Sequence, residues 1–274
     1  MSVKSARQVE GQRLVYYRSQ ANVAFWDAHW KQSFSPKIYA RAERGYLGEL
    51  EKPFTRYLPK LGRILEAGCG LGQYVLALRV RGYDVEGVDW ASETVETVRG
   101  IYADIPIRQG DATQLEVPDG YYSGYISLGV VEHRREGPEP FLQEAYRVLN
   151  DNGIMLLSVP WFHSLRRAKA RLGLYRGRVD DLEFYQYAFT SAEMSNILQH
   201  MGFIIVTTYA GNSFKGVKDE IPVLREVAQW RPVNWLGYKL LQHWEWAEQN
   251  LGHMIMFICR KSILSDRPSG KLAT

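Results

Sequence analysis

The chain has little cysteine and no long apolar run. Cys69 and Cys259 are its only cysteines among 274 residues, and they form no C-x-x-C pair. This excludes a disulfide framework and gives no reason to expect a metal site. No apolar stretch approaches the ~20 residues that span a bilayer, and residues 1–18 contain no apolar signal core. We therefore expect a soluble, cytoplasmic protein.

The excess of positive over negative charge is also small. The formal net charge is +4, and 46% hydrophobic with 23% charged residues is an ordinary globular composition. We therefore expect no nucleic-acid partner. Residues 166–178 contain six basic residues and no acidic one. Such a stretch indicates a solvated helix face, or alternatively a surface that attracts anionic headgroups.

The order of apolar segments predicts an α/β fold. Residues 4–57 show helical spacing of aromatic and aliphatic residues. From residue 63 onward, short apolar runs alternate with amphipathic stretches, as in βαβ units with a parallel sheet. We expect one domain, with a helical N-terminal cap (1–60), a core (61–210 and 252–261) and a helical insertion (211–251). The expected strands are 63–67, 84–88, 105–108, 124–128, 154–159, 203–209 and 254–259; the expected helices between them are 74–81, 92–102, 140–149 and 191–200.

A glycine loop follows the first expected core strand. The pattern G-x-G-x-G spans Gly68–Gly72, and glycine lets a ligand approach the main chain closely. A dinucleotide site needs a third glycine at the position of Gln73 or Val75, depending on the register. A P-loop is excluded because no Gly-Lys-Ser/Thr follows. The loop therefore predicts a small polar ligand other than a pyrophosphate.

Acidic residues occur near the ends of three successive expected strands. Glu66 precedes the loop, and its carboxylate suits a ligand with an ammonium group. Asp89 ends the next strand, where it could accept hydrogen bonds from ribose hydroxyls. Asp111 follows the third strand and could accept a bond from an adenine amino group. Because open α/β sheets bind ligands at the carboxyl edge, the three acids together indicate a nucleoside site.

These segments resemble the successive motifs of class I S-adenosylmethionine-dependent methyltransferases. Within that superfamily they are most similar to the small-molecule branch that includes ubiquinone and menaquinone biosynthesis enzymes. The resemblance covers roughly residues 60–210 and resumes at 252–261. One departure is Asn150–Gly153, where the family usually has Lys-Pro-Gly-Gly. The matching segments are Glu66–Gly72, Asp89, Gly110–Ala112, Ile126–His133 and Glu144–Gly153.

The resemblance implies a Rossmann-like sheet of seven mostly parallel strands, with an antiparallel last strand and helices on both faces. It also implies S-adenosyl-L-methionine as the cofactor, lying over Gly68, Gly70 and Gly72 with its methionine end toward Glu66. Asp89 would hold the ribose hydroxyls. The remaining contacts that it implies are Trp90 against adenine, Asp111 and Ala112 at the adenine edge, and main-chain groups of Leu128 and Gly129 near the methionyl ammonium.

The acceptor site is expected where aromatic residues gather outside the shared core. The N-terminal segment holds Tyr16, Tyr17, Phe25, Trp26 and Trp30, and the insertion holds four of the eight tryptophans. Both segments could cover the cleft and recognise an apolar or aromatic small molecule, or simply pack on the sheet or against another subunit.

His133 is the first candidate for a general base, since it follows the fourth expected strand beside Glu132. It could instead only shape the pocket. Tyr16, Tyr17 and His163 are weaker candidates for the same role.

Three other functions are compatible with the sequence to different degrees. The chain could be a catalytically silent binding module that keeps the cofactor fold, although the three acids argue against this. It could be a methyltransferase acting on a lipid or quinone at a membrane surface, through its basic stretch and its tryptophans. A nicotinamide oxidoreductase is disfavoured by the missing third glycine.

Overall fold

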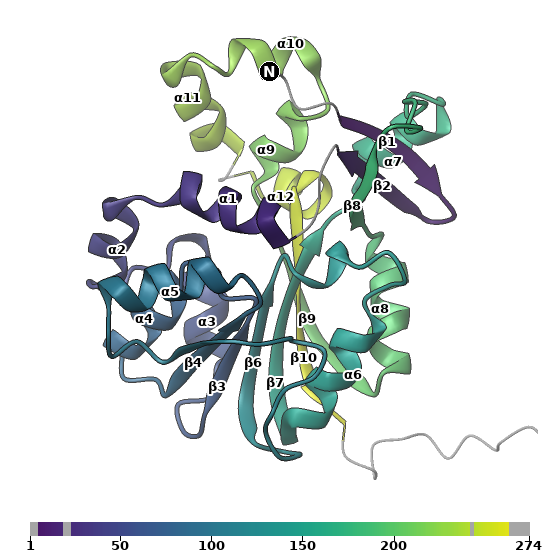
Figure 1. Ribbon diagram of the computed structural model, residues 1–274. Coiled ribbons are helices and arrows are strands. Elements are labelled where there is room, and N and C mark those ends of the chain that lie inside the picture. The colour runs from purple at the N-terminus through teal and green to yellow at the C-terminus, as the bar shows by residue number, and fades with distance from the viewer. Residues whose placement is uncertain (1–4, 19–22, 242–243, 263–274) are drawn as a thin grey trace, which may run out of the picture.

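A large sheet forms the centre of the computed structural model, which describes residues 5–18, 23–241 and 244–262. In these residues seven strands pair in the order β5-β4-β3-β6-β7-β10-β9 (Figure 1). β10 runs antiparallel to β7 and β9, whereas the other pairs are parallel. The predicted mostly parallel sheet with an antiparallel last strand is confirmed. The strands are β3 (Ile64–Ala67), β4 (Val85–Asp89), β5 (Ile107–Gln109), β6 (Tyr122–Leu128), β7 (Leu149–Pro160), β9 (Phe203–Gly211) and β10 (Met254–Lys261).

Helices cover both faces of this sheet, and successive strand residues point alternately toward them. Ile64 belongs to the apolar cluster on one face and Leu65 to the cluster on the other. Strands buried on both faces read as nearly continuous apolar runs, which is why the sequence located them well. One face carries α2 (Pro36–Ala42), α3 (Glu51–Tyr57), α4 (Gln73–Val80) and α5 (Ser92–Ile101); the other carries α6 (Glu139–Val148) and α8 (Ser191–His200).

The N-terminal segment corrects the sequence prediction. Residues 4–57 were expected to be helical, but β1 (Ser5–Glu10) and β2 (Arg13–Arg18) form a hairpin whose turn includes Gly11 at φ 58°. β2 also pairs with β8 (Glu183–Ala188), a strand absent from the prediction. Because this partner lies far along the chain, local spacing contained no sign of the pairing. Helical structure begins only at α1 (Val23–Ser33).

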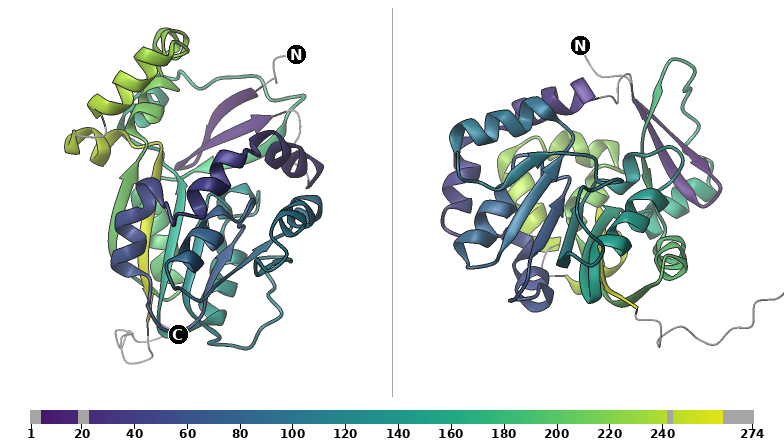
Figure 2. Two further views of the ribbon diagram at one scale, coloured as in Figure 1. Left: turned by 90° about the vertical axis from the view of Figure 1, so that its left-hand side faces the viewer. Right: turned by 60° about the horizontal axis from the view of Figure 1, so that its bottom comes forward.

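The accessory elements gather beyond one edge of the large sheet (Figures 1 and 2). The chain enters them as it leaves the carboxyl ends of β7 and β9, so this edge is also the one that parallel α/β sheets use for ligands. None of the described helices is long and apolar enough to cross a bilayer. The accessory helices that follow these strands are α7 (Ser164–Arg171), α9 (Ser213–Lys218), α10 (Pro222–Val227), α11 (Arg231–Leu241) and α12 (Glu245–Leu251).

A buried carboxylate joins these elements to one another. Glu220, between α9 and α10, accepts hydrogen bonds from Arg7 of β1 at 2.5 Å, Arg166 of α7 at 3.0 Å, Lys169 of α7 at 2.9 Å and Tyr175 at 2.6 Å. Burial disfavours the charge on Glu220, but Arg7, Tyr175 and Lys169 outweigh it and lower the pKa of this carboxyl to about 2. One side chain therefore ties the hairpin, α7 and the insertion together.

Replacing Glu220 with Gln should lower the free energy of unfolding by about 3–5 kcal/mol, because it leaves the buried guanidinium of Arg166 without its counter-charge. The pKa of Glu220 is below the value of about 4.3 for an unfolded glutamate, so its stabilisation is present at neutral pH and is lost as the pH falls toward about 2. Denaturant titrations at several pH values measure both effects. Glu226→Gln, on the exposed side of α10, is the matched control, and equal unfolding free energies for the two variants at neutral pH would refute the role of Glu220.

Candidate functional site

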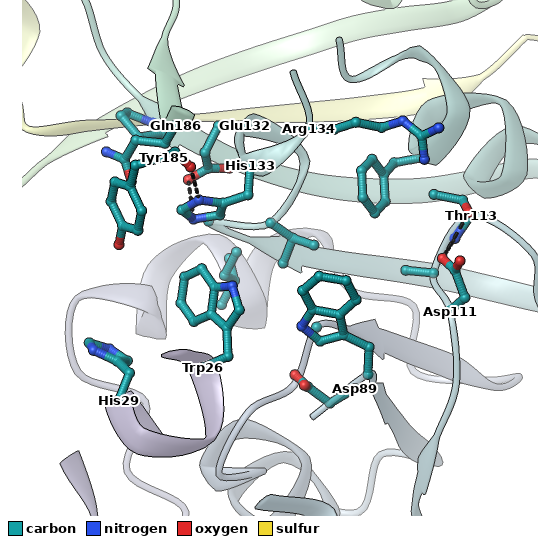
Figure 3. A pocket seen from close by; sticks show the side chains of 18 of the residues that line it. Trp26, His29, Asp89, Asp111, Thr113, Glu132, His133, Arg134, Tyr185 and Gln186 are labelled. Carbon is teal, nitrogen blue, oxygen red and sulfur yellow. Dashed lines mark hydrogen bonds and ion pairs between the residues drawn. The ribbon is translucent and has the colours of Figure 1, made fainter. Parts of the chain in front are cut away.

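A cavity of about 590 Å³ opens at the carboxyl edge of the large sheet. Its floor comes from the ends of β3, β4 and β6, and its walls come from α1, from the segment after β6 and from β8 (Figure 3). Asp89 and Asp111 lie on one side, and Trp26, His133 and Tyr185 lie on another. Both the size and the mixture of aromatic and polar groups are typical of small-molecule sites.

The glycine loop between β3 and α4 has a left-handed backbone at alternate positions. Gly68, Gly70 and Gly72 have φ values of 76°, 50° and 66°. A Cβ atom at these positions would lie 2.3 Å from Val130, 2.5 Å from the ring of Trp30 and 2.2 Å from Ile107. Both the backbone angles and the close packing therefore require glycine. Gly68 lines the cavity itself, whereas the other two form the turn behind it.

Asp89 fixes the loop from the end of β4. Its Oδ2 accepts a hydrogen bond from the Gly70 amide at 2.8 Å, and its Oδ1 accepts one from the Ala91 amide at 3.0 Å. The side chain lines the cavity although only 6% of Asp89 is exposed. Burial raises the pKa of Asp89 against the opposing effect of these amide bonds. Trp90, half exposed, follows it in the same wall.

Glu66 lies beneath the loop rather than in the cavity wall of the described residues. It is 2% exposed, and its Oε2 has no hydrogen-bond partner in the part of the chain that the structure describes. Burial raises the pKa of this carboxyl to about 8. At neutral pH the group is therefore mostly protonated, and a cation placed over the loop would favour its ionised form.

Asp111 and Ala112 line the far end of the cavity after β5. The Oδ1 of Asp111 accepts hydrogen bonds from the amide of Thr113 at 2.7 Å and from its hydroxyl at 2.8 Å. These bonds orient the exposed carboxylate in the cavity wall. Leu128 and Gly129, at the end of β6, line the cavity as well, and Gly129 has φ 71°.

His133 and Glu132 lie in a short 3-10 turn, η2 (Val131–His133), after β6. The Nδ1 of His133 lies 2.8 Å from the carbonyl oxygen of Tyr185, which can only accept, so Nδ1 carries the proton and Nε2 keeps its lone pair. Burial lowers the pKa of His133 to about 4 and raises the pKa of Glu132 to about 8. Both side chains are therefore mainly uncharged at neutral pH.

One wall of the cavity comes from α1 and β8, which lie outside the segments that resemble methyltransferase motifs. From α1, Trp26 lies with its ring centroid 4.6 Å from that of His133, and it stacks at 6.2 Å on Tyr185 of β8. The excess of aromatic residues in the N-terminal segment predicted a cover for the cleft, and two of these residues, Trp26 and Trp30, line the cavity. Tyr185 was missed because β8 has no apolar run that would separate it from a loop.

Other sequence candidates lie elsewhere. Tyr16, Tyr17 and His163 do not line the cavity in the described residues, and Tyr17 instead donates a hydrogen bond to Glu10. The insertion tryptophans, expected as cover for the cleft, are likewise outside this wall and are more than half exposed. They were misplaced because aromatic composition does not indicate which way a helix faces.

Comparisons with known proteins agree on the core. Residues 65–157 match the family model described as a methyltransferase domain. This part of the chain is therefore similar to methyltransferase domains. A probable S-adenosylmethionine-dependent methyltransferase of Mycolicibacterium smegmatis is 30% identical over 146 residues, which is 53% of each chain. A ubiquinone biosynthesis O-methyltransferase of Azorhizobium caulinodans is 35% identical over 101 residues, covering 35% of this chain and 39% of that one.

A solved structure extends the likeness of the fold beyond the sequence match. A Methanosarcina mazei S-adenosylmethionine-dependent methyltransferase has a TM-score of 0.55 at 15% identity, covering 77% of this chain and 97% of that chain. The match to the first curated relatives spans only about half of their length. The match to the family model runs from β3 to β7, and the accessory elements lie outside it.

Gly68→Ala should destabilise the protein more than Gly82→Ala does. Both glycines have similar left-handed angles, φ 76° and 83°, but only Gly68 faces a blocking side chain, Val130. The left-handed backbone should cost either alanine variant about 1–2 kcal/mol of unfolding free energy. At Gly68, overpacking against Val130 should add about 1–3 kcal/mol. Denaturant unfolding measures the difference. Val130→Ala combined with Gly68→Ala should recover part of the loss, and equal effects of the two single variants would contradict the packing argument.

Proposed function

We propose that this protein is an S-adenosylmethionine-dependent methyltransferase that transfers a methyl group to an apolar or aromatic small-molecule acceptor. The observation that supports it best is the convergence of Gly68, Asp89, Asp111 and Gly129 on one cavity, beside an aromatic wall. These four residues and the aromatic wall form the kind of site expected for a nucleoside with a charged amino-acid tail that binds next to a second ligand.

The residues present fit this cofactor. The glycine loop is tightly packed, and Gly68 presents main chain without a Cβ atom to the cavity that it lines. The unpartnered Oε2 of Glu66 lies below the loop, where a cationic methionine end would favour its ionisation. Asp89 would hold the ribose, and Asp111 with Ala112 would hold the adenine edge. Trp90 supplies an exposed ring beside Asp89 for stacking.

When bound, the cofactor supplies a methyl group that is already activated by its sulfonium. The chain's own task is to position the acceptor in line with that methyl and to exclude water. Such positioning supplies up to ~7–11 kcal/mol of a reaction barrier. Trp26 and Trp30 of α1 line the cavity and are suited to both roles.

His133 is proposed as the general base for an acceptor that must lose a proton. Its Nδ1 proton is held by the Tyr185 carbonyl, so Nε2 is the atom that can accept. Its lowered pKa keeps it unprotonated across the neutral range. A neutral, oriented imidazole suits brief proton transfer in a transition state more than lasting protonation.

The acceptor should be largely apolar or aromatic. Outside the glycine loop, the cavity lining includes the aromatic or apolar side chains of Trp26, Phe141, Phe184, Tyr185 and Met254, together with polar side chains such as those of His133, Arg134 and Gln186. Flat aromatic and sulfur-containing side chains favour planar, weakly polar ligands. The partial likeness to a ubiquinone biosynthesis O-methyltransferase agrees with a phenol or quinol, and an enol or an amine on a ring would fit the same wall.

Binding should separate this function from a nicotinamide oxidoreductase. Calorimetry should detect S-adenosylmethionine and S-adenosylhomocysteine but not NADH. Asp89→Ala should weaken both nucleosides roughly ten- to hundredfold, because it removes a charged acceptor and releases the Gly70 amide. Asp104→Ala, in the exposed loop before β5, is the control and should bind like the unchanged chain. Tight NADH binding with no response to S-adenosylmethionine would overturn the proposal.

His133→Asn should lower the rate of methyl uptake about 10²- to 10⁴-fold with a phenol or quinol, because asparagine can still donate to Tyr185 but offers no base. Its affinity for S-adenosylmethionine should be unchanged. With the unchanged chain, the rate should fall as the pH drops toward about 4, where His133 becomes protonated, and the variant should lack this limb. Transfer from labelled cofactor to a panel of phenols, quinols, sugars and lipids provides the readout, with His200→Asn on α8 as the control. An unaltered rate would reduce His133 to a residue that shapes the pocket.

The same panel tests the catalytically silent alternative. A chain that binds S-adenosylmethionine, yet methylates no member of the panel while an authentic methyltransferase in the same assay does, would support a binding module. The intact acids and the oriented His133 favour an enzyme, because a silent relative would not need to retain them.

A further inference from the structure

Glu132 is a buried carboxyl group in the wall of the cavity. Only 2% of the residue is exposed, and its Oε2 has no hydrogen-bond partner in the described part of the chain. The similarly buried Glu220, in contrast, accepts hydrogen bonds from four side chains. Buried polar groups in native proteins are normally paired, so an unpartnered carboxyl that lines a cavity indicates a ligand as its partner.

The position of Glu132 relates it to the acceptor side of the cavity. Figure 3 shows Glu132 and His133 together near Tyr185, whereas Asp89 lies across the cavity. The Oε1 of Glu132 is 3.9 Å from Nε2 of His133, the ring atom that keeps its lone pair. At this distance the two atoms are too far apart to hydrogen-bond to each other. A single ligand atom between them can lie within hydrogen-bond distance of both.

The carboxyl group of Glu132 is neutral, because no charge in its surroundings compensates an ionised form. An unpaired carboxylate is costly to bury, and among the described residues the only ion-pair distance to Glu132 is the one to His133, whose ring is neutral. Burial raises the pKa of Glu132 to about 8, and it also raises the pKa of the nearby Tyr185. Arg18 and His29 act on His133 and lower its pKa further. A neutral carboxyl can donate a hydrogen bond as well as accept one.

We propose that Glu132 is a further catalytic residue, which donates a hydrogen bond to an acceptor hydroxyl while His133 removes the proton of that hydroxyl. The inference rests on the proposed methyl transfer and specifies oxygen as the reacting atom. The oxygen forms the bond to the methyl carbon, the electron pair of the broken carbon–sulfur bond stays on sulfur, and the proton passes to Nε2 of His133. A neutral acid in a buried site is suited to stabilising the negative charge that develops on the oxygen.

The two side chains together favour a hydroxyl over an amine. A hydroxyl oxygen donates its proton to His133 and has two lone pairs, one for attack on the methyl group and one for the hydrogen bond from Glu132. A neutral amine has one lone pair, and attack on the methyl group consumes it. A protonated amine has none, and it would favour the ionised form of Glu132 instead.

Two substitutions separate the hydrogen bond of Glu132 from its packing. Glu132→Gln keeps a donor of nearly the same size, so the rate of methyl uptake by panel phenols and quinols should stay within about tenfold. Glu132→Met fills the space but donates nothing, and it should lower kcat about 10²- to 10³-fold with little change in the affinity for S-adenosylmethionine. Glu96→Met, on the exposed side of α5, is the matched control. Circular dichroism establishes that each variant is folded.

The protonation of Glu132 is measured without turnover. The infrared difference spectrum between the unchanged chain and Glu132→Gln should contain the carbonyl band of a protonated carboxyl at neutral pH. This band should disappear as the pH rises through about 8, where Glu132 ionises. The kcat/KM of the unchanged chain should fall over the same range, because an ionised carboxylate accepts hydrogen bonds but does not donate them. Glu132→Gln should lack that fall.

A pair of probes with the same ring tests the choice of oxygen. 1-Naphthol and 1-naphthylamine differ only in the group that would lie between Glu132 and His133. The unchanged chain should methylate 1-naphthol about tenfold faster than the amine, because only the hydroxyl satisfies both side chains. Glu132→Met should lose most of this preference.

The outcomes distinguish this inference from the proposed function. Equal kcat values for Glu132→Met and Glu96→Met overturn the role of Glu132 but leave a methyltransferase. An ionised Glu132 at neutral pH, or faster methylation of 1-naphthylamine than of 1-naphthol, overturns it as well. If the unchanged chain methylates no member of the whole panel, the proposed function is refuted and this inference fails with it.

Discussion

The hydrogen bond from the Gly70 amide to the Asp89 carboxylate joins the two strand ends on which the site is built. It closes the loop after β3 onto the end of β4, and three left-handed glycines are what let the loop approach so closely. Val130, Trp30 and Ile107 fill the space that Cβ atoms would need. The loop is therefore held by packing and by a carboxylate, and Gly68 and Asp89 are fixed in the cavity wall.

The accessory elements determine what lies opposite that loop. α1 places Trp26 against His133, and β8 places the Tyr185 carbonyl at Nδ1 of the same ring. The small sheet that contains β8 is joined through Arg7 and Glu220 to α7 and the insertion. A buried ionic centre is a strong restraint only while every charge is paired. Segments far apart in sequence thus cooperate in holding one wall of one cavity.

The site separates two electrostatic tasks. Asp89 and Asp111 present oriented carboxylate oxygens to the cavity, whereas His133, Glu132 and Glu66 are buried groups that are mainly neutral at neutral pH. The neutral form of these three groups limits the free-energy cost of their burial. On the surface of α11, the Lys239 ammonium lies over the exposed ring of Trp235.

Local sequence determined the central sheet, the glycine loop and the positions of Asp89 and Asp111, because strands buried on both faces and tight turns impose short-range patterns. It also indicated His133, although not its tautomer. Only the tertiary structure decided that residues 5–18 are strands, since β2 is stabilised by β8, more than 160 residues away. The same holds for Tyr185 in the cavity wall, for Glu66 beneath the loop and for tryptophans facing outward. The position of each of these residues depends on which distant segment packs beside it. A local sequence pattern does not identify that segment.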